Sequence, residues 1–71
     1  MNVLEKKALI RKAINFKNYV SAREIFLVLC ILYPVQSECF KGASEIGQLL
    51  IQMQDIRYIK NGKTTSKLYF I

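Results

Sequence analysis

Apolar residues recur at the spacing of a helix in two stretches of the chain. In residues 2–16 they share one arc of a helical wheel, at Leu9, Ile10, Ala13, Ile14 and Phe16. In residues 43–54 they follow the i, i+3, i+4, i+7 spacing of a buried stripe, at Ile46, Leu49, Leu50 and Met53. Because such a stripe covers one face of an amphipathic helix, the pattern predicts a first helix over about 2–16 and a third over about 43–54.

Between these two helices, residues 25–33 form a continuous apolar run behind a helix start signal. Ser21 and Glu24 have the spacing of a capping box, in which each side chain can satisfy the other residue's free backbone N–H. Isoleucine, valine and phenylalanine would also suit a buried strand, but the capping box favours a helix over about 21–33. Pro34 ends this helix, because the residue before a proline is kept out of helical geometry. Residues 37–41 are either the first turn of the third helix or a separate short turn.

The end of the chain, residues 56–71, has the pattern of a β-hairpin. Two strand-like stretches flank Asn61-Gly62, which is the preferred dipeptide of a tight hairpin turn. Tyr19-Val20 is a candidate for a short first strand. The predicted order is therefore three helices followed by a hairpin, in a single domain over 1–71 that is mainly α with a small β-hairpin.

The composition is that of a small folded domain. The chain has 71 residues, of which 52% are hydrophobic and 23% are charged, and this excludes a disordered protein. The apolar run of residues 25–33 lies mid-chain and is far shorter than the roughly 20 residues that a membrane-spanning helix needs. We therefore expect no membrane association, a cytoplasmic location (in the host cell if the protein is viral), and two reduced thiols at Cys30 and Cys39.

The sequence contains no group of residues that indicates catalysis. The chain has no histidine, which is the commonest general base and a frequent metal ligand. Its five acidic residues are scattered, and no glycine-rich loop has the spacing of a phosphate cradle. We therefore expect a protein that is not an enzyme and that has no cofactor and no metal.

Charge is strongly positive overall but unevenly distributed. The formal net charge is +6, with eleven lysines and arginines against five acidic residues. Residues 1–20 hold five positive charges and one negative, and residues 56–71 hold four positive charges and none negative. The middle of the chain, residues 21–55, holds two positive charges and four negative ones. Such an excess favours a polyanionic partner, which is nucleic acid or an anionic membrane surface.

Three segments in this order resemble the winged helix-turn-helix proteins. Residues 19–25 (YVSAREI) look like the entry to their second helix, residues 43–50 (ASEIGQLL) like their third, recognition helix, and residues 57–63 (RYIKNGK) like their wing. The last two segments also look like the small C-terminal winged-helix domains attached to some phage primase-helicases. The resemblance covers nearly the whole chain and implies double-stranded DNA binding, with the third helix in the major groove and the wing on the backbone or in the minor groove.

This resemblance implies a set of DNA-contacting residues. A polar arc of the third helix would face the bases, with Lys41, Ser44, Gln48 and Gln52. The wing would contact phosphates through Arg57, Lys60, Lys63 and Lys67, and the first helix would add Lys7, Arg11 and Lys12 if that face is presented.

Two departures from the pattern keep other functions open. The third helix carries no lysine or arginine, and Glu45 and Asp55 lie on its polar side. From Ile25 onward the second helix is apolar on every side, so part of it is a candidate contact with a second copy or another protein, through Phe26, Leu29, Cys30 and Tyr33. We expect a transcriptional regulator of bacterial or phage origin. The alternatives are a protein-interaction module on the same fold that docks on a host or replication protein, and a replication accessory domain.

Overall fold

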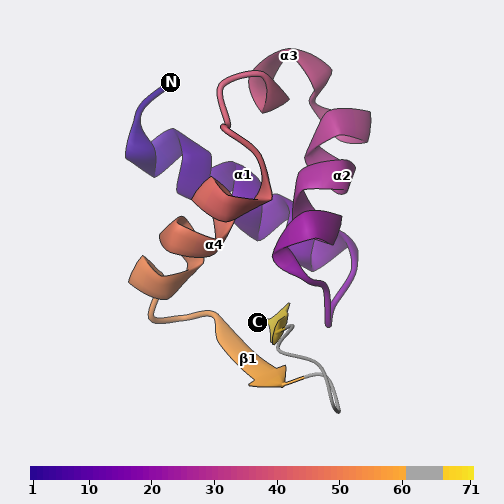
Figure 1. The fold of residues 1–71 in the computed structure, drawn as a ribbon, viewed down its shortest axis with the longest axis vertical. Coiled ribbons are helices and arrows are strands. Elements are labelled where there is room, and N and C mark those ends of the chain that lie inside the picture. The colour runs from indigo at the N-terminus through magenta and orange to yellow at the C-terminus, as the bar shows by residue number, and fades with distance from the viewer. Residues whose placement is uncertain (61–66) are drawn as a thin grey trace.

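In the computed structural model, which describes residues 1–60 and 67–71, the chain is mainly helical and ends in two antiparallel strands (Figure 1). The elements of the described residues are α1 (Val3–Phe16), α2 (Ala22–Leu32), α3 (Pro34–Ser37), α4 (Ala43–Gln52), β1 (Arg57–Lys60) and β2 (Lys67–Phe70). This order of three long helices followed by paired strands is the one predicted. The Asn61-Gly62 turn and Lys63 lie outside the described residues.

The helix boundaries follow from local sequence signals. The Asn2 side chain accepts a hydrogen bond of 2.8 Å from the Glu5 backbone N–H, which caps α1. Ser21 Oγ accepts one of 3.2 Å from the Glu24 backbone N–H, so the serine half of the predicted capping box is confirmed. The Glu24 carboxylate pairs with the Lys17 ammonium at 3.3 Å. Helix α2 ends at Leu32, before Pro34, as predicted.

Residues 34–42 resolve the question of where the third long helix begins. Pro34 is the first residue of α3, a separate single turn, where its missing N–H costs no hydrogen bond. Gly42 then has a φ of 112°, a backbone conformation that residues with a side chain rarely adopt. Because this conformation is not helical, α4 begins at Ala43 and cannot extend back to Ser37.

The core lies where α1, α2 and α4 meet. In Figure 1, α1 passes behind α2 and α4, and the strands lie below the helices. The largest fully buried side chains are Ile10, Ile14, Val20, Ile25, Leu29 and Ile46. Phe16 was predicted on the buried arc of the first helix, and this was wrong, because it is the last residue of α1 and is 67% exposed.

The two strands pair with each other, and β2 also forms a single bridge to the segment before α2. Strands β1 and β2 pair with Arg57 opposite Phe70 and Lys60 opposite Lys67. Val20 forms an isolated bridge to Tyr69 on the other edge of β2, with N–H···O distances of 3.1 and 2.7 Å. The short strand predicted at Tyr19-Val20 is therefore present only as this single bridge at Val20, because Tyr19 has a φ of 61°, which is not a strand conformation. The spatial order is Val20, β2, β1. The backbone hydrogen bonds of Val20 therefore hold β2 next to the start of α2.

Candidate nucleic-acid interface

Helix α4 turns a mostly polar face to solvent. Ser44, Gln48 and Gln52 are exposed and lie four residues apart, on the side of α4 opposite the buried Ile46 and Leu49. Lys41 is also exposed but precedes the helix, so it lies beside this face and not within it. The predicted polar arc is therefore accessible, and its role in DNA binding remains a prediction.

One residue of this face was missed at the sequence level. Ile51 is 76% exposed, although it lies next to the buried Leu50 in the sequence. It follows Gln48 by three residues and Ser44 by seven, so all three share one side of the helix. That spacing was available from the sequence, but an apolar residue among core positions was not considered as part of an exposed surface.

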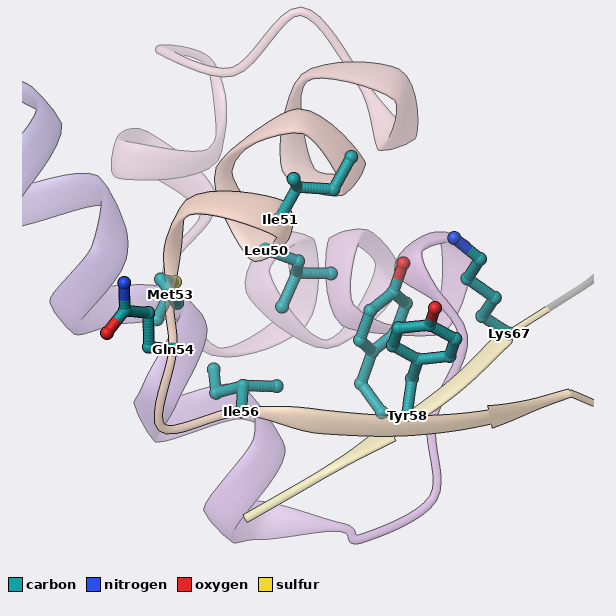
Figure 2. Close-up of a pocket in the computed structure, with 8 residues that line it drawn as sticks. Leu50, Ile51, Met53, Gln54, Ile56, Tyr58 and Lys67 are labelled. Carbon is teal, nitrogen blue, oxygen red and sulfur yellow. The ribbon is translucent and has the colours of Figure 1, made fainter.

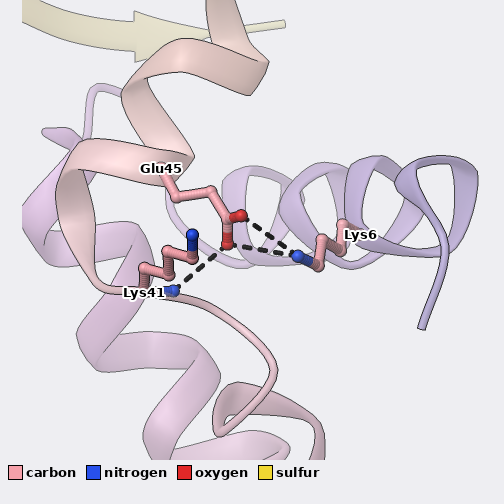
Figure 3. Close-up of polar contacts among 3 residues, drawn as sticks. All are labelled: Lys6, Lys41 and Glu45. Carbon is pink, nitrogen blue, oxygen red and sulfur yellow. Dashed lines mark hydrogen bonds and ion pairs between the residues drawn. The ribbon is translucent and has the colours of Figure 1, made fainter.

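The acidic residue at the start of α4 is neutralised by α1. The Lys6 ammonium lies 3.2 and 3.1 Å from the two carboxylate oxygens of Glu45, and the Lys41 backbone N–H donates to one of them at 3.1 Å (Figure 3). The hydrogen bond from Lys6 and then that from Lys41 hold the pKa of Glu45 below its ordinary value. The negative charge of Glu45 is therefore balanced by the positive charge of Lys6 on α1.

The second acid near α4 is neutralised in the same way. Arg11 Nε and Nη2 each lie 2.9 Å from an Asp55 carboxylate oxygen, which makes a bidentate pair. The hydrogen bond raises the pKa of Arg11 and lowers the pKa of Asp55. Arg11 was predicted to contact phosphate. In the structure its guanidinium lies in an exposed ion pair with Asp55, and a phosphate contact by Arg11 remains a prediction. Of the other two candidates on α1, Lys7 is half-buried, and Lys12 is exposed with its ammonium 5.8 Å from the Tyr33 ring centroid.

The described residues of the two strands carry positive charge and no acidic residue. Arg57 and Lys60 are exposed, and Lys67 lies directly opposite Lys60 across the two strands. None of these three forms an ion pair within the described part of the chain. Like charges directly opposite each other are unfavourable in a sheet, so this end of the molecule is suited to receive an anion.

A pocket of about 320 Å³ lies between the C-terminal end of α4 and the strands. In Figure 2, Lys67 and Tyr58 stand at one end of it, and the lysine ammonium lies 4.5 Å from the tyrosine ring centroid. Burial, and to a lesser degree the neighbouring Tyr58, raises the pKa of Tyr69, which also lines the pocket. Ile51 of the exposed α4 face and Lys67 of the strands therefore line the same pocket.

The apolar face of α2 differs from the predicted one. Leu29 was predicted at a partner interface, and this was wrong, because it is fully buried in the core. Phe26, Cys30 and Tyr33 are half-buried. The most exposed residues of the helix interior are Leu27 and Ile31, at 51% and 77%.

Two further observations bear on function. Within residues 1–60 and 67–71, no helix is long and apolar enough to cross a membrane, and no group of three or more potential metal ligands is found. Comparison with known proteins gives no matching family model, no matching curated protein and no matching solved structure. The functional argument therefore depends on this chain's own residues.

Proposed function

We propose that this protein binds double-stranded DNA as a winged helix, with α4 toward the major groove and the paired strands on the phosphate backbone. Three features support this arrangement. They are the order of the helices and strands, the edge pairing of Val20 with β2, and the solvent-facing side of α4. With ten residues, α4 is about 15 Å long, and a helix of ordinary diameter fits a major groove that is about 12 Å wide. Such a protein would regulate transcription by occupying its site.

The observation that carries the proposal is the pairing of the acids around α4. Unpaired, Glu45 and Asp55 would be repelled by DNA phosphates. Instead, Lys6 and Arg11 of α1 hold both carboxylates, while Arg57, Lys60 and Lys67 have no acid beside them in the described residues. Lys6 and Arg11 of α1 thus offset the two acids beside α4, and the charge of the described strand residues is left for a polyanion.

The proposal is tested by duplex binding as a function of salt concentration. For a basic interface, the logarithm of the binding constant falls linearly with the logarithm of the salt concentration. Each lysine that contacts a phosphate contributes about 0.9 to the steepness of that fall. Lys60→Gln should therefore weaken binding to all sequences alike and reduce the slope by about one. Lys17→Gln is the matched control, because that lysine is already paired with Glu24 at 3.3 Å. Absence of binding at low salt would exclude this function.

The second candidate function is protein association through α2. Leu27 and Ile31 are four residues apart, so they form one exposed apolar ridge on the side of α2 away from Leu29. Single exposed apolar residues are ordinary, but a ridge on a helix favours a second copy or another protein as partner. A solution mass that stays at 8.2 kDa at every protein concentration would exclude self-association.

A further inference from the structure

The exposed face of α4 has a chemical bias. Ser44, Gln48 and Ile51 point most directly away from the core, and Gln52 lies at the edge of the same face. None of these four is charged, and α4 itself contains no lysine or arginine. Whatever this face recognises is therefore read by two amides, a hydroxyl and an apolar side chain.

These side chains match one kind of base pair. Arginine and lysine are the usual partners of guanine, and a free carboxylate is the usual partner of the cytosine amino group. The face has no cation, and its neighbouring carboxylate, Glu45, is occupied by Lys6 and by the Lys41 backbone N–H. Glutamine, in contrast, forms two hydrogen bonds to adenine, and an apolar side chain packs on the thymine methyl group.

Gly47 adds an independent observation. It lies one turn before Ile51, in the interior of α4, where glycine is less favourable than alanine. Apart from its chain neighbours and the backbone of its own helix turns, a Cβ atom at this position would meet no atom within 4 Å, so packing among the described residues does not require a glycine here. A glycine without an internal reason next to Ile51 fits the close approach of a ligand to the helix backbone.

We propose that α4 reads A·T base pairs, with Ile51 against a thymine methyl group, Gln48 on the adjacent adenine, and Gly47 allowing the approach. The inference rests on the proposed DNA-binding function and adds the class of sequence recognised. It places an apolar contact at the centre of the reading face, where polar side chains alone were expected.

The test compares duplexes of equal length that differ only in their central base pairs, by fluorescence anisotropy at one low salt concentration. The A·T duplex should bind about tenfold more tightly than the G·C duplex. Replacing thymine with uracil removes only the methyl group and should weaken binding about fourfold. Replacing adenine with 7-deazaadenine removes the N7 acceptor and should weaken binding by a similar factor.

Variants assign these effects to residues. The Ile51→Ala variant should bind thymine and uracil duplexes with equal affinity. The Gln48→Ala variant should bind adenine and 7-deazaadenine duplexes with equal affinity. Val35→Ala is the matched control, because Val35 is 74% exposed on α3 and should leave the thymine preference intact. Gly47→Ala should weaken binding to every duplex without lowering the melting temperature of the protein.

The outcomes separate this inference from the function on which it rests. Equal binding of A·T and G·C duplexes would overturn the A·T preference while leaving DNA binding in place. A thymine preference that survives in Ile51→Ala would overturn the role of Ile51. No binding to any duplex at low salt would overturn both.

Discussion

The carboxylate of Glu45 is held from two sides, by the Lys6 ammonium and by the Lys41 backbone N–H. Both hydrogen bonds lower the pKa of Glu45 from its ordinary value of 4.5 in the folded protein. The folded state therefore binds this proton less tightly than the unfolded chain does. The stability that results is complete above about pH 4.5 and is lost as the pH falls through the lowered folded pKa.

Glu45→Gln should therefore lower the free energy of unfolding at neutral pH. It should also make that free energy decrease less steeply as the pH falls into the acidic range. Urea denaturation at a series of pH values from neutral to below the ordinary pKa measures both effects. Glu38→Gln is the control, because Glu38 is exposed and forms no ion pair within the described residues, so its pH dependence should match that of the unsubstituted protein. Parallel pH curves for Glu45→Gln and the unsubstituted protein would contradict the contribution of the Lys6 contact.

Two leucines of α2, two positions apart, should lose very different amounts of stability when each is replaced with alanine. Leu29 is fully buried among the three long helices, so Leu29→Ala leaves a cavity and should cost about 2–5 kcal/mol of stability. Leu27 is 51% exposed, and Leu27→Ala should change the stability by about 0.5 kcal/mol or less. Chemical denaturation of the two variants checks the difference. Equal costs would mean that Leu27 is buried in solution, as it would be in a stable dimer.

At the scale of elements, the boundaries of α2 and its end at Pro34 could be predicted, because caps and prolines act on their immediate neighbours. The face that α2 buries could not be. From Ile25 onward the helix is apolar on every side, so this stretch does not by itself distinguish Leu29 from Leu27, and the packing of α1 and α4 decides which side is covered. The ion pair of Arg11 and Asp55 could not be predicted from the sequence for a similar reason, since it joins residues 44 positions apart.

Helix α4 offers a matched pair of glycines on which the same substitution should have opposite effects. Gly42 precedes the helix with a φ of 112°, so Gly42→Ala forces a strained backbone and should cost about 1–3 kcal/mol. Gly47 lies inside the helix with open space around it, so Gly47→Ala should stabilise the protein by about 0.5–1 kcal/mol. Thermal or urea unfolding of both variants measures the two signs. A destabilised Gly47→Ala would show that the helix interior needs the glycine for the fold itself.

For the molecule as a whole, the cations of the strands and the apolar ridge of Leu27 and Ile31 lie on different elements. Helix α1 pairs with the acids beside α4, and α2 presents its apolar ridge on the side away from the core. The cations of the strands form no ion pair within residues 1–60 and 67–71. The proposed nucleic-acid binding and the proposed protein association therefore use different elements of the fold. A single fold of this size can carry both, with DNA at α4 and the strands and a second copy at α2.

Two equally exposed isoleucines test this separation, because Ile31 on α2 is 77% exposed and Ile51 on α4 is 76% exposed. Ile31→Ser should lower any concentration-dependent increase in solution mass, measured by light scattering, and leave duplex affinity and its salt slope unchanged. Ile51→Ser should leave the solution mass unchanged and remove the preference for thymine over uracil. Each variant thus serves as the control for the other, since both remove the same apolar group. If both variants changed both measurements, the two faces would form one continuous surface, and the assignment of separate functions to α2 and α4 would be wrong.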